Sequence, residues 1–354
     1  MGKGVLNAIE NISQKLGPSI IGSDPTRQFE IDQRLIGVDG SPDKSALGAN
    51  SILSISLAVC RAGSMAANVS LYRWVWELAK AVGSVDANLP AKIPTPLFNM
   101  INGGLHGAGN LDFQEFQVIP ASSKPYSEAL RSSVEVYHAI EDSLKRRGAI
   151  HSVGYEGGYA PNLFTNSDAL AINVEAIGSA GYQIGQDFFL GLDVASQSFY
   201  KDEKYSIRDR SNPLTNTSMI AFFEELVREY RLTVLEDPLE PDDWDSWRQL
   251  TEKIGGSVLV VGDDLLTTNP GRVQTGIEKK ACNSMIIKPN QIGTITETLQ
   301  VVKLARGANW KIIVSHRSGE TNDFFIADFA VGVKADFVKF GAPARGERVA
   351  KYNR

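Results

Sequence analysis

The chain has 354 residues, of which 43% are hydrophobic and 22% are charged, and its formal net charge is -5. This composition is that of an ordinary globular protein and argues against a disordered or fibrous one. Its length favours two domains, or one large α/β barrel with an appendage. Because Lys and Arg are scattered over a net acidic chain, the sequence argues against a nucleic-acid partner.

Two further features of the sequence narrow the class of protein. The two cysteines, Cys60 and Cys282, lie far apart in apolar stretches, which predicts buried free thiols rather than a disulfide or a metal knuckle. No apolar stretch reaches the roughly 18 residues that cross a bilayer, and no secretory signal is recognisable. We therefore expect a cytoplasmic protein without a membrane span.

The first 88 residues read as almost entirely helical. Apolar residues recur at helical spacing between residues 4 and 16, and Gly17-Pro18 is expected to end that helix. Further helices are expected from about Thr26, from about Ser45 and in the segment LYRWVWELAKAV. Residues 1–88 are therefore predicted to form a mostly helical N-terminal capping domain.

After a linker at residues 88–91, short apolar runs alternate with longer amphipathic segments, which is typical of β/α units. The predicted strands are 96–101, 115–119, 189–193, 233–236, 258–262, 284–288, 311–315 and 336–339. About 250 residues is the usual size of a TIM-type β/α barrel, which is the α/β fold predicted for residues 89–354. A doubly wound open sheet is the alternative, but it would need a Gly-rich phosphate turn after an early strand, which the sequence lacks.

Charged residues close several of these strands, where a barrel places its active site. These residues are Asp193, Glu236, Asp263, Lys288 and His316. Any one of the acids alone would be more readily explained as a helix cap or turn residue. Five successive strands that each deliver a polar group to one rim indicate a functional site.

Three carboxylates that converge on one spot resist ionisation unless a cation compensates them, so Asp193, Glu236 and Asp263 predict a divalent metal site. Oxygen-only ligands select a hard ion, and Mg²⁺ fits best. Zinc is disfavoured, because neither cysteine lies near a candidate ligand and the histidines show no metal-site spacing.

The basic residues predict an anionic substrate. Neighbouring cations would lower the pKa of Lys288 and make it a general base, although simple pairing with a carboxylate is the alternative. Arg317 and Ser318 form a donor-rich turn in SHRSGET that suits a phosphate or carboxylate, and Lys339 adds a second cation. By itself, His106 in NGGLHGAGN could equally be a solvated loop residue.

Together the motifs resemble the enolase family along nearly the whole chain. They are GANSILSISLA, PTPLFNMINGG, QEF, EGGYAPN, LGLDVAS, LEDPLEPDDW, VGDDLLTTNP, IIKPNQIGT, SHRSGET and KFGAPARGERVAKYN. The resemblance implies Mg²⁺-dependent, reversible dehydration of 2-phospho-D-glycerate to phosphoenolpyruvate in glycolysis. It also implies a homodimer. Racemases and cycloisomerases of the wider superfamily lack the SHRSGET and GAPARGER stretches.

The resemblance also implies a role for each matching residue. Lys288 is the expected base and Glu156 the expected acid. Glu115 is also an expected catalytic residue, because it helps Glu156, and Gln114 braces the site beside it. Asp193, Glu236 and Asp263 are the expected Mg²⁺ ligands, of which Glu236 and Asp263 also face the substrate. The expected substrate-binding residues are His106, Gln114, Glu115, Ser315, His316, Arg317, Ser318 and Lys339, with His316 also counted among the catalytic groups.

The sequence departs from the family pattern in several places. We expect the chain to lack the opening strands, the serine loop that binds a second Mg²⁺, and the last helix. Tyr155 stands where the family usually has Asp, which could lower the pKa of Glu156, and Leu105 is also atypical. These departures leave open a catalytically impaired binding or structural protein on the same scaffold.

Overall fold

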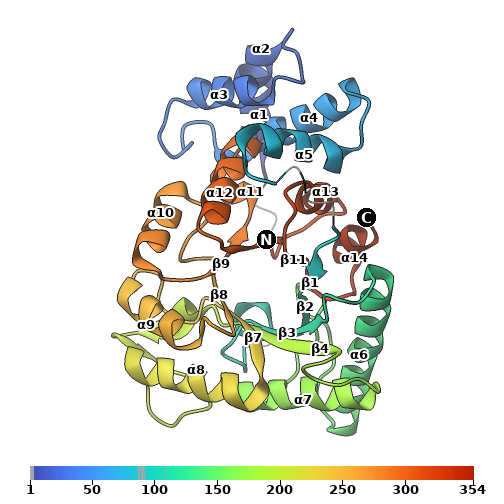
Figure 1. Ribbon diagram of the computed structural model, residues 1–354, viewed down its shortest axis with the longest axis vertical. Coiled ribbons are helices and arrows are strands. Elements are labelled where there is room, and N and C mark those ends of the chain that lie inside the picture. Colours follow the sequence, from blue (N-terminus) through green and yellow to red (C-terminus); the bar gives the residue numbers. More distant parts are fainter. Residues whose placement is uncertain (1–3, 87, 89–91, 108) are drawn as a thin grey trace.

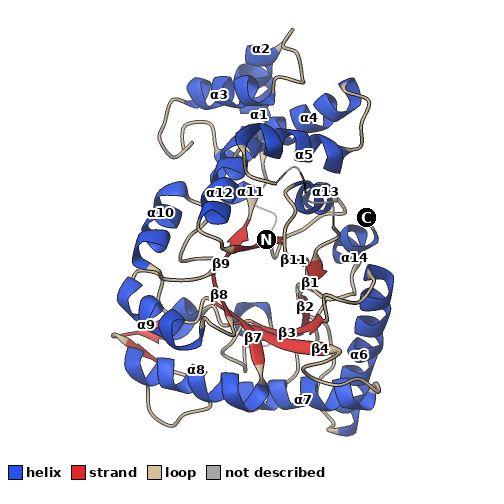
Figure 2. Ribbon diagram, in the orientation of Figure 1, coloured by secondary structure: helices blue, strands red, loops and turns tan. Residues whose placement is uncertain are grey.

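The computed structural model describes residues 4–86, 88, 92–107 and 109–354, and its largest unit is a closed barrel (Figures 1 and 2). A nine-stranded sheet runs in the order β1-β11-β10-β9-β8-β7-β4-β3-β2. Its two outer members, β1 (Thr95–Pro96) and β2 (Phe98–Asn102), are separated only by Leu97. One continuous segment therefore closes the sheet on itself, which confirms the predicted barrel and excludes the open sheet.

The barrel is not uniformly parallel. Strand β3 (Glu115–Pro120) pairs antiparallel with both β2 and β4 (Phe188–Asp193). Two successive helices, α6 (Tyr126–Arg146) and α7 (Asn166–Ser179), connect β3 to β4. Because a single crossover helix would make neighbouring strands parallel, the second helix allows β4 to run in the opposite direction.

The remaining strands are parallel and alternate with helices that surround the barrel (Figure 2). The strands are β7 (Leu232–Glu236), β8 (Leu259–Gly262), β9 (Ser284–Ile287), β10 (Lys311–Ser315) and β11 (Phe337–Lys339). The helices are α8 (Asn216–Tyr230), α9 (Trp244–Ile254), α10 (Pro270–Lys279), α11 (Pro289–Ile292), α12 (Ile295–Gly307), α13 (Phe325–Gly332) and α14 (Gly346–Asn353). A small hairpin, β5 (Tyr200–Lys201) and β6 (Lys204–Tyr205), follows β4.

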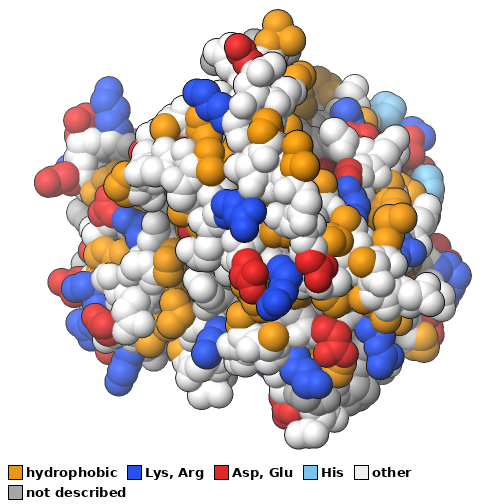
Figure 3. All heavy atoms as spheres, turned by 90° about the horizontal axis from the view of Figure 1, so that it is seen from above, with side chains coloured by type: hydrophobic (Ala, Val, Ile, Leu, Met, Phe, Trp, Pro, Cys, Tyr) orange, Lys and Arg blue, Asp and Glu red, His pale blue; other side chains and the backbone are white. Residues whose placement is uncertain are grey.

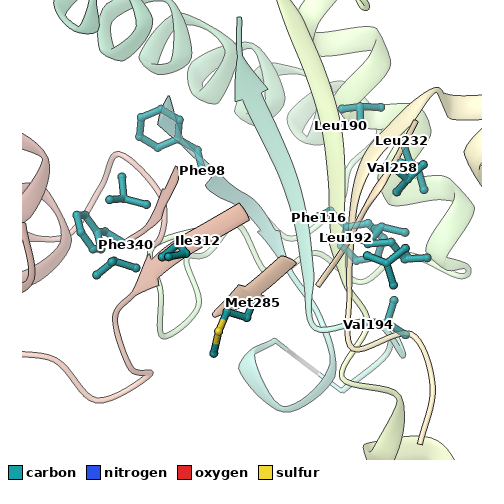
Figure 4. Close-up of a cluster of buried hydrophobic side chains, with 14 of the residues drawn as sticks. Phe98, Phe116, Leu190, Leu192, Val194, Leu232, Val258, Met285, Ile312 and Phe340 are labelled. Carbon is teal, nitrogen blue, oxygen red and sulfur yellow. The ribbon is translucent and has the colours of Figure 1, made fainter. Parts of the chain in front are cut away.

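Alternate strand residues face two different cores. Inside the barrel, an apolar layer takes a residue from most strands: Leu97, Ile119, Val234, Val261, Ile286 and Ile313, with Phe189 and Phe337 packed against it. Neighbouring residues such as Phe116, Leu190 and Leu192 belong to the larger cluster shown in Figure 4, which the surrounding helices cover. The interior layer fills one end of the barrel, which leaves polar side chains to the other end.

The N-terminal helices sit on one side of the barrel (Figure 1). They are α1 (Leu6–Asn11), α2 (Gly17–Ile20), α3 (Gln28–Asp39), α4 (Ala49–Ala66) and α5 (Leu71–Val82). This agrees with the mostly helical character expected for this part of the chain. The linker expected at residues 88–91 lies largely outside the described residues.

The expectation that Gly17-Pro18 ends the first helix is wrong. A π-helical turn at Ile12–Leu16 joins α1 to α2, and the chain stays helical to Ile20. The N–H of Gly17 donates to the carbonyl of Ile12, and a Cβ at Gly17 would lie 2.8 Å from that oxygen. Because Pro18 falls in the first turn of α2, its missing N–H is tolerated.

Among the described residues, no single helix is long and apolar enough to cross a membrane. Helices α4 and α5 pass that test only as a pair, and the chain bends by 104° between them.

On the outer face of the N-terminal helices, hydrophobic side chains lie between acidic and basic ones (Figure 3). Val5, Leu6 and Ile9 of this region are exposed.

A buried polar network fixes the N-terminal helices to the barrel. The Asp32 carboxylate accepts hydrogen bonds from the Thr296 N–H at 3.0 Å, the Thr296 hydroxyl at 2.5 Å and the Gln28 amide at 3.0 Å. The Ser56 hydroxyl accepts from the Ile295 N–H at 3.0 Å. Since buried donors must be paired, this network specifies how α3 and α4 dock on α12.

Replacing Asp32 with Ala should lower the free energy of unfolding by about 3 kcal/mol, because the N–H and the hydroxyl of Thr296 would both lose their buried acceptor. Urea unfolding measures this change. Glu10→Ala on the exposed face of α1 is the matched control and should change stability by less than about 0.5 kcal/mol. Equal stability of the two variants would contradict the docking role of Asp32.

Candidate active site

A cavity of about 310 Å³ opens at the carboxyl ends of the parallel strands. Of the residues predicted for the site, those that line it are His106, Gln114, Glu115, Glu156, Asp193, Asp263, Lys288, Ser315, His316, Arg317, Ser318 and Lys339. Glu236 does not line the cavity, because it is fully buried behind Lys339. The predicted residues therefore converge on one place.

Strand direction explains why these positions meet. Asp193 and Glu236 are the last residues of β4 and β7 and lie opposite each other in the parallel register. Glu115 is the first residue of β3, but β3 is antiparallel to β4, so Glu115 lies opposite Asp193 at the same rim. The reversed strand thus brings an acid from its start to the ends of its neighbours.

Lys339 lies at the centre of these acids. Its Nζ is 2.7 Å from Glu236 Oε1, 3.0 Å from Asp193 Oδ2 and 3.2 Å from Glu115 Oε1. Burial alone would lower the pKa of Lys339, but the surrounding carboxylates raise it well above its usual value. Lys339 therefore stays a cation at the bottom of the site.

One lysine does not compensate all the acids at this rim. Burial and nearby carboxylates raise the pKa of Glu236 and of Asp237 well above the usual range. Within the described residues, the buried Oε2 of Glu236 has no hydrogen-bond partner. Buried carboxylate oxygens that lack counter-charge fit a hard divalent cation. Which of them bind it stays a prediction for Asp193, Glu236 and Asp263.

Sequence reasoning missed Asp237 and Asp264. The Asp237 carboxylate accepts the N–H of Asp263 at 2.9 Å and the N–H of Asp264 at 2.7 Å, so it holds the turn that carries the predicted ligand. Oxygens of these three residues lie within 4.8 Å of one another. The available signal was a second acid directly after each strand, in LEDP and VGDD.

Lys288 lies against Asp263, with which it forms an ion pair. Burial has the largest effect and lowers the pKa of Lys288, but the charge and hydrogen bond of Asp263, together with the charge of Glu236, make the net direction upward. The nearest charged group is an anion rather than a cation. The lowered pKa expected for Lys288 depends on a neighbouring cation and stays a prediction. The lysine is nevertheless held in the cavity, since its backbone N–H donates to the Thr268 hydroxyl at 3.0 Å.

Glu156 is buried among hydrogen-bond donors. Its Oε2 accepts from the Asn99 amide at 3.0 Å and lies 3.3 Å from His316 Nε2, while Oε1 lies 3.4 Å from His106 Nδ1. Although burial raises the pKa of Glu156, the histidines and Lys339 lower it well below its usual value. For Glu115, burial dominates and its pKa is raised.

The ring of Tyr155 points to solvent, with 66% of the residue exposed. The groups that lower the pKa of Glu156 are His316, His106 and Lys339, and the effect expected from Tyr155 stays a prediction. Asn99, which sequence reasoning also missed, adds an amide donor from the buried strand β2.

The loop that carries His106 is folded tightly against the site. His106 Nε2 lies 2.8 Å from the Ser318 hydroxyl, and its side chain is only 12% exposed. A Cβ at Gly107 would lie 2.5 Å from the carbonyl of Asn102, so only glycine fits there. The alternative of a solvated loop histidine is excluded. Arg317 is exposed beside Ser318 and lines the cavity, and its Nη1 donates to Asn290 Oδ1 at 3.4 Å.

The comparisons with known proteins agree on one family. The model of the enolase C-terminal TIM barrel domain matches residues 90–354, and that of the enolase N-terminal domain matches residues 1–75. The division into domains at residues 88 and 89 stays a prediction.

Two curated relatives cover almost the whole chain. An enolase from Acidothermus cellulolyticus is 47% identical over 352 residues, which is 99% of this chain and 79% of the relative. An enolase from Beutenbergia cavernae is also 47% identical, over 99% of this chain and 80% of its own length. The chain therefore belongs to the enolase family, and it is a carbon–oxygen lyase of the phosphopyruvate hydratase class.

Proposed function

We propose that the chain catalyses the Mg²⁺-dependent, reversible dehydration of 2-phospho-D-glycerate to phosphoenolpyruvate, with Lys288 as base and Glu156 as acid. The observation that carries this proposal is the convergence of Lys288, Glu156, Lys339 and the Arg317–Ser318 turn on one cavity. The cavity offers a base, an acid and cations to a small anion. The homodimer stays a prediction.

The first step is removal of the proton on C2 of the substrate. Neutral Lys288 takes this proton at Nζ, and the electron pair moves toward the substrate carboxylate, which gains a second negative charge. Lys339 is positioned to stabilise that charge as a buried cation. Asp193, Glu236 and Asp263 would hold Mg²⁺, which, when bound, supplies further positive charge and offsets the Asp263 anion that now keeps Lys288 protonated.

In the second step the electron pair forms the C2–C3 double bond and the C3 hydroxyl leaves. Glu156 gives the departing oxygen a proton, which yields water. Burial raises the pKa of Glu115, whereas the two histidines and Lys339 lower the pKa of Glu156, which favours Glu115 as the holder of a shared proton before substrate binds. A bound phosphate near His106 and Ser318 would raise the pKa of Glu156 by its negative charge, which transfers the proton to the acid when substrate is present.

The two proton-transfer roles can be separated by experiment. Lys288→Ala should lose both turnover and exchange of the C2 proton with D₂O, and kcat should fall by at least about 10²–10⁴-fold. Glu156→Gln should lose turnover but keep the exchange, because the base is intact. Nuclear magnetic resonance of the substrate follows exchange, and absorbance of phosphoenolpyruvate follows turnover.

Lys279→Ala at the exposed end of α10 is the matched control and should retain both activities. If Lys288→Ala still exchanges the C2 proton at the wild-type rate, Lys288 is not the base. If Glu156→Gln turns over normally, the acid is another group.

The metal assignment is tested by calorimetric titration with Mg²⁺. Glu236→Gln should weaken Mg²⁺ binding by at least about tenfold, because even groups that only support metal ligands contribute that much. Asp245→Asn, at an exposed position in the first turn of α9, is the charge-matched control and should bind like the wild type. Unchanged affinity in Glu236→Gln would remove Glu236 from the ligand set.

The alternative, a catalytically impaired protein on the same scaffold, predicts a different result for the wild-type chain. It predicts no turnover and no C2 exchange in the presence of Mg²⁺, although the protein folds. The intact cavity and its buried cation favour the enzyme.

A further inference from the structure

Arg348 is a buried cation that touches both loops of the proposed chemistry. It lies near the start of α14 and is only 1% exposed. One terminal nitrogen donates to His316 Nδ1 at 2.6 Å and to the Arg317 carbonyl at 2.8 Å. The other donates to the Tyr155 carbonyl at 3.0 Å and to the Ser318 carbonyl at 2.7 Å. Its guanidinium therefore joins the turn that carries Glu156 to the turn that carries His316, Arg317 and Ser318.

The charge of this guanidinium is not taken up by a carboxylate in direct contact. Within the described part of the chain, the acid paired with Arg348 is Glu347, at 3.9 Å from Nε, which is beyond hydrogen-bond distance. The atoms that accept from Arg348 are three carbonyl oxygens and one imidazole nitrogen. A buried guanidinium with only neutral acceptors must be balanced from further away.

The hydrogen-bond chemistry decides the protonation of His316. Arginine carries only donors, so the Nδ1 that faces it must offer a lone pair. A neutral imidazole then carries its proton on Nε2. That nitrogen is buried and lies 3.3 Å from Glu156 Oε2, a close contact that lacks hydrogen-bond geometry, and no other described residue accepts from it. The neutral ring of His316 therefore lies between the Arg348 cation and the Glu156 carboxylate and contacts both.

We propose that Arg348 is a positioning residue that locks His316 in the neutral Nε2–H form and keeps this N–H beside the carboxyl group of Glu156. The guanidinium supplies the distant counter-charge for Glu156 through the ring. A second proton on His316 would have to occupy Nδ1, where Arg348 already donates.

The other groups around the His316 ring also affect its pKa. Burial lowers the pKa of His316, Glu156 raises it, and the cations Arg348 and Lys339 lower it again, with a net downward direction. Close packing holds the ring in place, since a Cβ at Gly341 would lie 3.1 Å from His316 Cε1 and 3.0 Å from Arg348 Cδ. Geometry and charge both favour a ring that stays neutral near pH 7.

The catalytic consequence rests on the proposed function, but the protonation state of His316 does not. It is read directly from the ligand-free protein by nitrogen-15 and proton spectra of histidine-labelled chain. The sequence contains only 4 histidines, so comparison with His316→Asn identifies the signals of His316. Spectra recorded from about pH 6 to about pH 8 should show His316 as the Nε2–H form throughout.

Arg348→Met removes the donors and the charge but keeps an apolar stem. In this variant His316 should take up a second proton within the same pH range, and a new ionisation should enter the pH profile of kcat. We expect kcat to fall about 10²-fold, as displaced catalytic groups do. Arg348→Lys keeps a cationic donor and should restore the wild-type form of His316 with part of the activity. Arg228→Met, at an exposed position in the last turn of α8, is the matched control.

An Nδ1–H form of His316 in the wild type would overturn the proposal, whatever the variants do. Wild-type His316 spectra in a folded Arg348→Met chain would overturn it as well. Because these readouts need no substrate, a chain that fails to dehydrate 2-phosphoglycerate could still show the locked histidine, which separates this inference from the proposed function.

Discussion

The concentration of buried carboxylates at one end of the barrel is the constraint on which the site depends. Glu115, Asp193, Glu236, Asp237 and Asp263 are all buried there, and such a group cannot ionise without cations. Lys339 and Lys288 supply part of the charge. The uncompensated remainder gives the physical reason for a divalent cation, and a dianionic intermediate could only form where positive charge is already arranged.

The direction of each strand determines which of its residues lies at this end of the barrel. The parallel strands bring their last residues to the rim, and the antiparallel β3 adds Glu115 from its first residue. The apolar layer around Val234, Val261 and Ile286 closes the other end of the barrel. It keeps water from reaching the charged groups from behind, so their interactions are stronger than at a surface.

Patterns of apolar residues were sufficient to predict the barrel and most of its strands, because a buried strand has to be apolar along its length. The acids at strand ends could be predicted as a group, because charge recurs after several successive strands, whereas one acid alone would be explained as a helix cap or turn residue. Local composition misled at Gly17-Pro18, because a π-helical turn at Ile12–Leu16 leads directly into α2, which contains both residues. The close pairing of Lys288 with Asp263 could not be predicted, because it depends on which side chains the fold brings together.

Arg348 and Asp237 show a further limit of prediction from sequence. Both act through hydrogen bonds to groups far away in sequence or to backbone N–H groups, and no spacing rule marks such contacts.

The measurement that tests the proposed function most directly is the rise in phosphoenolpyruvate absorbance when 2-phosphoglycerate is added to the wild-type chain with and without Mg²⁺. The account predicts turnover that requires Mg²⁺ and disappears on chelation. A folded chain that binds Mg²⁺ and shows no turnover would contradict it.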